Sequence, residues 1–263
     1  MKFGVIGCGK MGSAIISGIC QKNLLNKSDI FCFDVNNSVI DQLCKNGFGR
    51  LNSCSDAFSS CDVVLLAVKP QELNSLIASL KGPINCSLII SIMAGVKIAK
   101  IEQIKPNVSV CRVMPNTCAT IGESATSLCY NDKVDDTQKE FCRLVFSAIG
   151  DYVEIDESLM DDVIPIGGSF TAYAYTFMKA FIDSSIKRGI SEEVAKKLVI
   201  QSMIGSAKMV EEFNDITTLI KNVCSKGGTT IAGLEQLELN NFEKIIDDCA
   251  IACAERSKEL GKM

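Results

Sequence analysis

Short apolar runs alternate with helical patterns along the first half of the chain. Apolar positions recur at helical spacing between the runs, and strict alternation of strands and helices is typical of βαβ units. We therefore expect a mostly parallel, doubly wound sheet with helices on both faces. The expected strands are 2–6, 30–33, 63–68, 88–92, 108–113 and 152–154, and the expected helices are 12–22, 38–46, 71–80, 97–104 and 135–149.

The second half of the chain predicts helices and no convincing strand. The run 167–188 is apolar around most of its circumference, and a helix of that kind needs cover on all sides. In so short a chain we expect the cover to come from a second subunit. Further helical patterns start at Ser191 and continue over 216–223, 229–238 and 241–260. Two domains are expected, an α/β domain over 1–155 and an all-α domain over 156–263.

Composition narrows the functional classes. The 263 residues are 47% hydrophobic with a net charge of −4 and no basic block, so nucleic acid and membrane surfaces are not expected partners. The absence of histidine excludes Ser–His–Asp and Cys–His hydrolases and makes a metal site improbable. The fourteen scattered cysteines form no CxxC pair, and no signal-peptide pattern precedes the first strand. We expect reduced thiols and a cytoplasmic protein.

A glycine-rich loop follows the first strand and opens the first helix. In the GxGxxG pattern the glycines permit a tight turn, close approach of a pyrophosphate, and close helix–strand packing, which is typical of a Rossmann-like dinucleotide-binding domain. A glycine-rich turn without a ligand is the alternative interpretation. The residues of the loop are Gly7, Cys8, Gly9, Lys10, Met11 and Gly12.

An acidic residue ends the second expected strand. Asp34 lies 22 residues after Gly12, close to the spacing of about 20 at which a carboxylate binds the cofactor's ribose. A carboxylate there repels a 2′-phosphate, which favours NADH over NADPH. Asn36, Asn37 and Lys10 could bind a phosphate, so NADPH stays open.

Three turns follow later strands, where ligands of open parallel sheets bind. The first, Ala67–Val68–Lys69–Pro70, follows the 63–68 run, and the second, Met93–Ala94–Gly95, follows 88–92. Asn116 follows 108–113 and is expected near the nicotinamide. A solvated turn lysine and a simple Pro–Asn turn are the ordinary alternatives for Lys69 and Asn116.

A second glycine-rich junction lies in the helical half. After a helical run, two glycines free the backbone and two threonines open a new helix, whose N–H groups and dipole favour an anion such as a carboxylate. Helix capping by the hydroxyls is the alternative. The candidate residues are Ser225, Gly228, Thr229 and Thr230.

The order of the motifs GCGKMG, AVKP, MAGV, RVMPNT and SKGGTTIAGL resembles the pyrroline-5-carboxylate reductase family over nearly the whole chain. The resemblance implies NAD(P)H-dependent reduction of 1-pyrroline-5-carboxylate to L-proline, and a helical domain interlocked across a homodimer, with dimers often assembled into a ring. It also implies that the junction holds the substrate carboxylate, that Thr230 is the hydroxyl nearest the ring nitrogen, and that Asn222 belongs with the cofactor contacts.

The chain departs from the family pattern at several positions. Lys226 replaces a usual proline, and Ser169–Phe170–Thr171 replaces a usual Ser-Gly-Pro. Cys118 replaces a common proline, and Ile216–Thr217 replaces a frequent His-Pro. Because of these departures, the sequence does not determine the shape of the substrate pocket. Two alternative functions remain. A β-hydroxyacid dehydrogenase-like reductase would need a catalytic lysine in the long helix, and a non-enzymatic NAD(H)-sensing regulator would need no carboxylate site.

Overall fold

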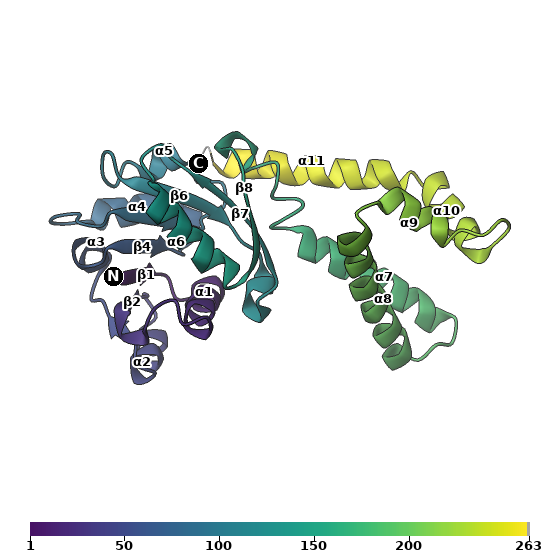
Figure 1. Cartoon of the computed structure of the whole chain (residues 1–263), viewed down its shortest axis with the longest axis horizontal. Coiled ribbons are helices and arrows are strands. Elements are labelled where there is room, and N and C mark those ends of the chain that lie inside the picture. The colour runs from purple at the N-terminus through teal and green to yellow at the C-terminus, as the bar shows by residue number, and fades with distance from the viewer. Residues whose placement is uncertain (262–263) are drawn as a thin grey trace. The chain divides into compact units, whose positions relative to one another are not determined.

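The computed structural model describes residues 1–261, which form two compact units (Figure 1). The first unit contains Met1–Thr171 and the end of the chain from Ala252 onward, and the second contains Ala172–Ile251. Each unit is described by itself. The domain boundary at residue 155 stays a prediction, and the return of the last helix to the first unit is a feature that the sequence pattern did not indicate.

One sheet of eight strands organises the first unit, in the order β3-β2-β1-β4-β5-β6-β7-β8. All neighbours pair in parallel except β6 and β7, which are antiparallel. The expected mostly parallel sheet is confirmed, and β3 and β7 are additional strands. The strands are β1 (Phe3–Ile6), β2 (Ile30–Phe33), β3 (Gly49–Arg50), β4 (Val63–Leu66), β5 (Leu88–Ser91), β6 (Ser109–Met114), β7 (Ser124–Tyr130) and β8 (Gly150–Glu154).

Strand β7 was missed because its sequence, SATSLCY, is rich in hydroxyls. Ser124, Thr126 and Ser127 are nevertheless buried. Thr126 Oγ1 donates to Ser124 Oγ at 3.0 Å, and Ser124 Oγ accepts from the backbone N–H of Asn116 at 3.0 Å. Buried hydroxyls that are hydrogen-bonded carry little penalty, so a strand that looks polar lies inside the fold.

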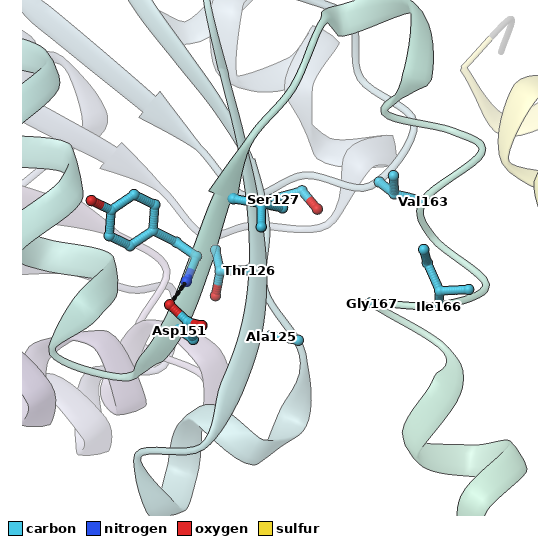
Figure 2. Close-up of a pocket in the computed structure, with 9 residues that line it drawn as sticks. Ala125, Thr126, Ser127, Asp151, Val163, Ile166 and Gly167 are labelled. Carbon is cyan, nitrogen blue, oxygen red and sulfur yellow. Dashed lines mark hydrogen bonds between the residues drawn. The ribbon is translucent and has the colours of Figure 1, made fainter. Parts of the chain in front are cut away.

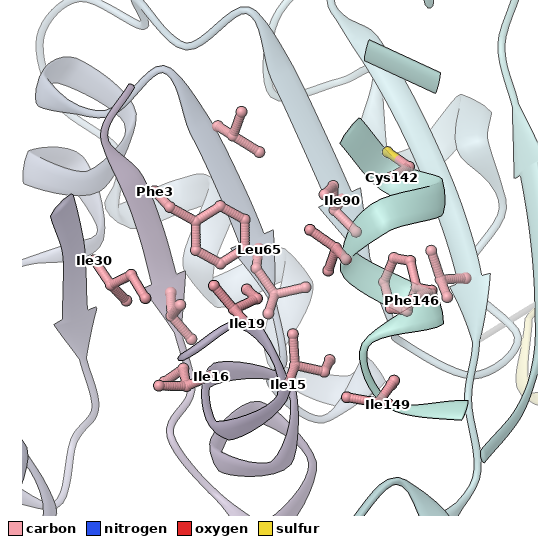
Figure 3. Packing of buried hydrophobic residues seen from close by; sticks show 14 of the residues in the cluster. Phe3, Ile15, Ile16, Ile19, Ile30, Leu65, Ile90, Cys142, Phe146 and Ile149 are labelled. Atoms are coloured by element: carbon pink, nitrogen blue, oxygen red, sulfur yellow. The ribbon is translucent and has the colours of Figure 1, made fainter. Parts of the chain in front are cut away.

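Helices cover both faces of the sheet, as parallel strands require. On one face, Phe3 and Leu65 pack with Ile15 of α1 and Phe146 of α6 (Figure 3). The other face holds a second apolar cluster that includes Phe58. The helices of this unit are α1 (Lys10–Gln21), η1 (Lys27–Asp29), α2 (Asn37–Lys45), α3 (Cys54–Ser60), η2 (Pro70–Glu72), α4 (Leu73–Ser79), α5 (Ile98–Ile101), η3 (Thr117–Ile121), α6 (Asp136–Ser147) and η4 (Glu157–Leu159).

The rest of the chain is helical, as predicted, and no strand follows β8 up to residue 261. Gly189, with φ of +86°, follows the end of α7, and Ser191 caps α8 by accepting from the N–H of Val194 at 3.4 Å. These helices are α7 (Phe170–Lys187), α8 (Glu192–Phe213), α9 (Ile216–Asn222), α10 (Thr229–Leu239) and α11 (Phe242–Leu260).

Within one chain, the helical unit has almost no core. No residue of α7 is buried, and in the whole of 172–251 only Ala195 is. Tyr175 is 57% exposed and Phe181 is 48% exposed. Residues 1–261 of the same chain therefore do not supply the cover expected for α7. Because apolar faces of this extent need burial, the structure favours a second copy as the cover.

We predict that the chain has no folded, active monomer at micromolar concentration. Each large apolar side chain that is buried contributes roughly 1.5–3 kcal/mol, and the single chain leaves many of them in water. Light scattering should report a dimer or a larger assembly. Phe181→Glu should dissociate that assembly and abolish activity, because it places a charge on a covered face. A monodisperse wild-type monomer with full activity would contradict the prediction.

Candidate functional site

The glycine loop after β1 is shaped by close backbone packing. Gly7 has φ of +96°, and a Cβ there would stand 2.5 Å from the carbonyl oxygen of Ala67. A Cβ on Gly12 would meet the carbonyl oxygen of Gly7. A Cβ on Gly9, by contrast, would meet nothing within 4 Å. Close backbone packing thus requires glycine at positions 7 and 12, whereas Gly9 borders open space.

The start of α1 is open to an anion. Gly9 is its N-cap, no side chain caps the helix, and no acidic residue lies in the first turn. Gly9 and Lys10 are exposed, Met11 is half-buried, and Cys8 is buried. A helix N-terminus without a side-chain cap leaves backbone N–H groups for a ligand. The uncapped helix start and the open space over Gly9 are the features that the pyrophosphate of a dinucleotide needs.

Asp34 connects the glycine loop to the end of β2. Its Oδ2 accepts from the backbone N–H of Cys8 at 2.7 Å, and its Oδ1 accepts from the backbone N–H of Asn36 at 2.8 Å. A carboxylate offers about four acceptor sites, so ribose hydroxyls could still be bound. Asn36 itself caps α2 through the N–H of Ser38 at 3.1 Å.

The turns after β4 and β5 lie at the carboxyl ends of neighbouring parallel strands. The N–H of Ala67 donates to the carbonyl of Ile6 at 2.8 Å, which holds this turn beside the glycine loop. Lys69, the N-cap of η2, is exposed, and Val68 and Pro70 on either side of it are half-buried. After β5, Met93 and Gly95 are buried and Ala94 is half-buried.

Asn116 is engaged by the protein itself. Its Nδ2 donates to the carbonyl of Gly167 at 2.9 Å, and its Oδ1 accepts from the N–H of Cys118 at 3.0 Å, which caps η3. The side chain is buried. These bonds assign Asn116 a structural role, and its contact with the nicotinamide stays a prediction.

The second candidate junction lies in the other unit, before α10. The N–H of Gly228 donates to the carbonyl of Ser225 at 2.8 Å, and Gly227 has φ of +71°. Gly228 is the N-cap of α10, and no side chain caps that helix. Thr229 and Thr230 are exposed. The capping interpretation of these hydroxyls is therefore wrong in this structure, and the start of α10 is open to an anion.

Asn222, expected among the cofactor contacts, is the last residue of α9 and is exposed. It belongs to the helical unit with the α10 junction, whereas the glycine loop, Asp34 and Ala67 are brought together in the first unit. The sequence had no signal by which to place Asn222 relative to that loop.

The fourteen cysteines are free in the structure. Burial raises the pKa of the Cys54 thiol and of the Cys86 thiol to about 11, so neither is a nucleophilic thiolate at neutral pH. Within residues 1–261, no group of three metal-ligating side chains is assembled. Over the same residues, no helix is long and apolar enough to cross a membrane.

A small cavity of about 180 Å³ opens beside β7 and β8. Figure 2 shows Thr126 and Ser127 of β7 on one side, with Val163 and Ile166 across from them. The lining is mostly apolar and contains none of the predicted site residues. We therefore assign the cavity no part in the chemistry.

Comparison with known proteins identifies the family. Residues 157–260 match the family described as pyrroline-5-carboxylate reductase dimerisation, and residues 2–95 match NADP oxidoreductase coenzyme F420-dependent. The pyrroline-5-carboxylate reductase of Synechocystis sp. is 36% identical over 264 residues, covering 100% of this chain and 99% of the relative. The chain belongs to the pyrroline-5-carboxylate reductase family. The Arabidopsis thaliana reductase is 30% identical, covering 99% of this chain and 96% of the relative.

Solved reductases of this family have the same fold. The Plasmodium falciparum pyrroline carboxylate reductase, whose crystal structure has NADP bound, is 33% identical with a TM-score of 0.89, covering 99% of this chain and 98% of the other. The expected resemblance, the Rossmann-like domain followed by a helical dimerisation domain, and the enzyme class of an NAD(P)H-dependent oxidoreductase are confirmed. Neither the dehydrogenase-like nor the non-enzymatic alternative gains support.

We predict that Gly9→Ala folds like the wild type but binds reduced nicotinamide dinucleotide at least about tenfold more weakly, equivalent to about 1.4 kcal/mol. Gly9 has φ of −69°, which alanine adopts without strain, and its Cβ would contact no protein atom. The thermal midpoint should stay equal or rise slightly. Titration calorimetry measures the affinity. Unchanged affinity would show that the open space over Gly9 does not receive the pyrophosphate.

Proposed function

We propose that this enzyme reduces 1-pyrroline-5-carboxylate to L-proline, with the substrate carboxylate held at the N-terminus of α10. The observation that carries the proposal is the uncapped start of α10, with two exposed threonines, in a chain of this family. Backbone N–H groups and the helix dipole both favour a carboxylate there. The proposed carboxylate-binding residues are Ser225, Gly228, Thr229 and Thr230.

The chemistry of a cyclic imine accounts for a site without histidine. The imine nitrogen can arrive protonated, so hydride adds to the ring carbon while the C=N electron pair moves to nitrogen. No alkoxide develops, and no strong general acid is required. The reduced nicotinamide cofactor supplies the hydride when it is bound. The protein's own residues bind and orient the two reactants, and Thr230 orients the ring N–H through its hydroxyl.

The first unit supplies the nucleotide site in this proposal. The glycine loop binds the pyrophosphate, Asp34 binds the adenosine ribose, and the turns after β4 and β5 border the cofactor. Their positions at the carboxyl ends of β1, β4 and β5 support this assignment. The proposed cofactor residues are Gly7, Cys8, Gly9, Lys10, Met11, Gly12, Asp34, Ala67, Val68, Lys69, Pro70, Met93, Ala94, Gly95, Asn116 and Asn222.

The working enzyme is proposed to be a homodimer built through the helical domain, with dimers assembled into a ring. The match to a dimerisation family over 157–260 and the uncovered apolar faces of α7 and α8 support a homo-oligomer. We place the domain boundary near residue 155 and the enzyme in the cytoplasm, with a small-molecule substrate and neither nucleic acid nor membrane as partner.

We propose NADH as the preferred cofactor. Asp34 lies at the end of β2, Val35 after it is 89% exposed, and no arginine lies in 35–38. A negative carboxylate beside an exposed apolar residue offers nothing to neutralise a 2′-phosphate. The NADP bound in the Plasmodium falciparum relative shows that the family also includes an NADP binder.

We predict that Asp34→Asn lowers the ratio of kcat/KM with NADH to kcat/KM with NADPH by about three- to tenfold, or ~0.7–1.4 kcal/mol. The substitution removes the charge that repels the 2′-phosphate. Asparagine keeps one acceptor oxygen, which can still accept from the N–H of Cys8 in the glycine loop. Steady-state kinetics with both cofactors measures the ratio. An unchanged ratio would remove Asp34 from cofactor selection.

We predict that Thr230→Ala lowers kcat/KM for 1-pyrroline-5-carboxylate by about 10–150-fold, equivalent to ~1.5–3 kcal/mol for a hydrogen bond to a charged group. Cofactor binding should change little. Thr230→Ser is the matched control, because it keeps the hydroxyl and should retain most of the activity. A loss confined to cofactor affinity would make the junction a cofactor element instead. No loss in either would move the substrate site elsewhere.

A further inference from the structure

A buried arginine lies at the centre of a polar network in the first unit. Arg112 of β6 is 2% exposed, and its guanidinium contacts Glu157 Oε1 and Asp161 Oδ1, each at 3.3 Å. A buried guanidinium with two carboxylate partners holds them in fixed directions. The removal of one partner leaves an uncompensated buried charge, which is strongly destabilising.

Each carboxylate of this network also accepts a hydrogen bond from a different segment of the chain. Glu157 Oε1 also accepts from the backbone N–H of Ile98 at 2.7 Å, at the start of α5. Asp161 Oδ1 also accepts from Ser257 Oγ at 2.7 Å, near the end of α11. Arg112 therefore connects the segment that follows β5 to the last turns of the chain.

The end of α11 presses directly on the turn after β5. Gly95 has φ of +73°, and a Cβ there would stand 3.2 Å from both the carbonyl oxygen of Ser257 and the amide nitrogen of Gly261. A Cβ on Gly261 would stand 2.5 Å from the carbonyl oxygen of Gly95. The two backbones thus approach so closely that Gly261 has no room for a side chain, and at Gly95 a side chain would be both tightly placed and strained by the positive φ.

We propose that the last turn of α11 is a positioning element for the cofactor-binding turn Met93–Gly95. Ser257 and Gly261 are then positioning residues that act on the nicotinamide dinucleotide through this turn. The inference rests on the proposed function, which assigns the turn to the cofactor. The segment is held at both ends, by the α11 contact at Gly95 and by Glu157 at Ile98.

In this arrangement, residues that lie within the dimerisation match but belong to the first unit act on nucleotide affinity. Glu157, Asp161 and Ser257 lie within the dimerisation match, whereas Gly95 is the last residue of the oxidoreductase match. Binding groups need placement within about 0.5 Å, so a displaced turn loses affinity even when no residue that contacts the cofactor has changed. The positioning therefore predicts a nucleotide defect from substitutions at the far end of the chain.

The test is Gly261→Ala, whose methyl group must displace the carbonyl of Gly95. We expect the dissociation constant for NADH or NADPH to rise about tenfold, with the KM for 1-pyrroline-5-carboxylate unchanged at saturating cofactor. The fluorescence of the reduced nicotinamide reports binding, and the chain has no tryptophan to interfere. Lys258→Ala is the matched control, because this exposed lysine of the same turn forms an ion pair with Asp162, at 2.6 Å, and its loss should leave affinity within about twofold.

Ser257→Ala provides the second variant should Gly261→Ala fail to fold. It removes one hydroxyl from Asp161 and should weaken nucleotide binding in the same direction, with rescue by Ser257→Thr. Wild-type affinity in a folded Gly261→Ala or Ser257→Ala overturns the positioning role while leaving the proposed function intact. An equal loss in Lys258→Ala also overturns it, as general destabilisation. Failure of the wild type to bind reduced nucleotide would instead refute the proposed function.

Discussion

The close approach of β1 and β4 at their carboxyl ends is the constraint on which the nucleotide-binding region depends. Gly7 leaves no room for a side chain beside the carbonyl of Ala67, and Gly12 leaves none beside the carbonyl of Gly7. These contacts bring the start of α1 down onto the sheet. A bulkier residue at either position would displace α1 from the sheet. The N–H groups at the start of the helix would then be shifted away from the ligand-binding position at the strand ends.

The helical unit obeys a different constraint. Only Ala195 is buried among residues 172–251 of one chain, so we expect folding and association of this unit to be coupled, with a stability that depends on protein concentration. The periodicity of the sequence predicted the apolar helix 167–188 but not the surface that buries it. An apolar helix face indicates that it is buried and does not indicate by what. The match to a dimerisation family supplies what the pattern cannot.

Elements with strong local signals were predictable from sequence. The five apolar strands of the parallel sheet, the capped start of α8 at Ser191 and the glycine loop all follow from residue type and spacing. Strand β7 was not predictable, because its buried hydroxyls bond one another only once the fold exists. The network around Arg112 could not be predicted from the sequence either, because its members are far apart along the chain. Asp161 and Ser257, for example, are 96 residues apart. The glycine loop could be found in advance, whereas its connections to distant segments could not.

The two oxygens of Asp34 have a consequence for the thermodynamics of cofactor binding. One oxygen accepts from the N–H of Cys8 in the loop between β1 and α1, and the other accepts from the N–H of Asn36 after β2, so both segments are held in place by the protein alone. A loop that is ordered in advance loses little conformational entropy when a ligand arrives. Nucleotide association should then proceed without a slow ordering step, and its enthalpy should come mainly from new hydrogen bonds to the phosphates.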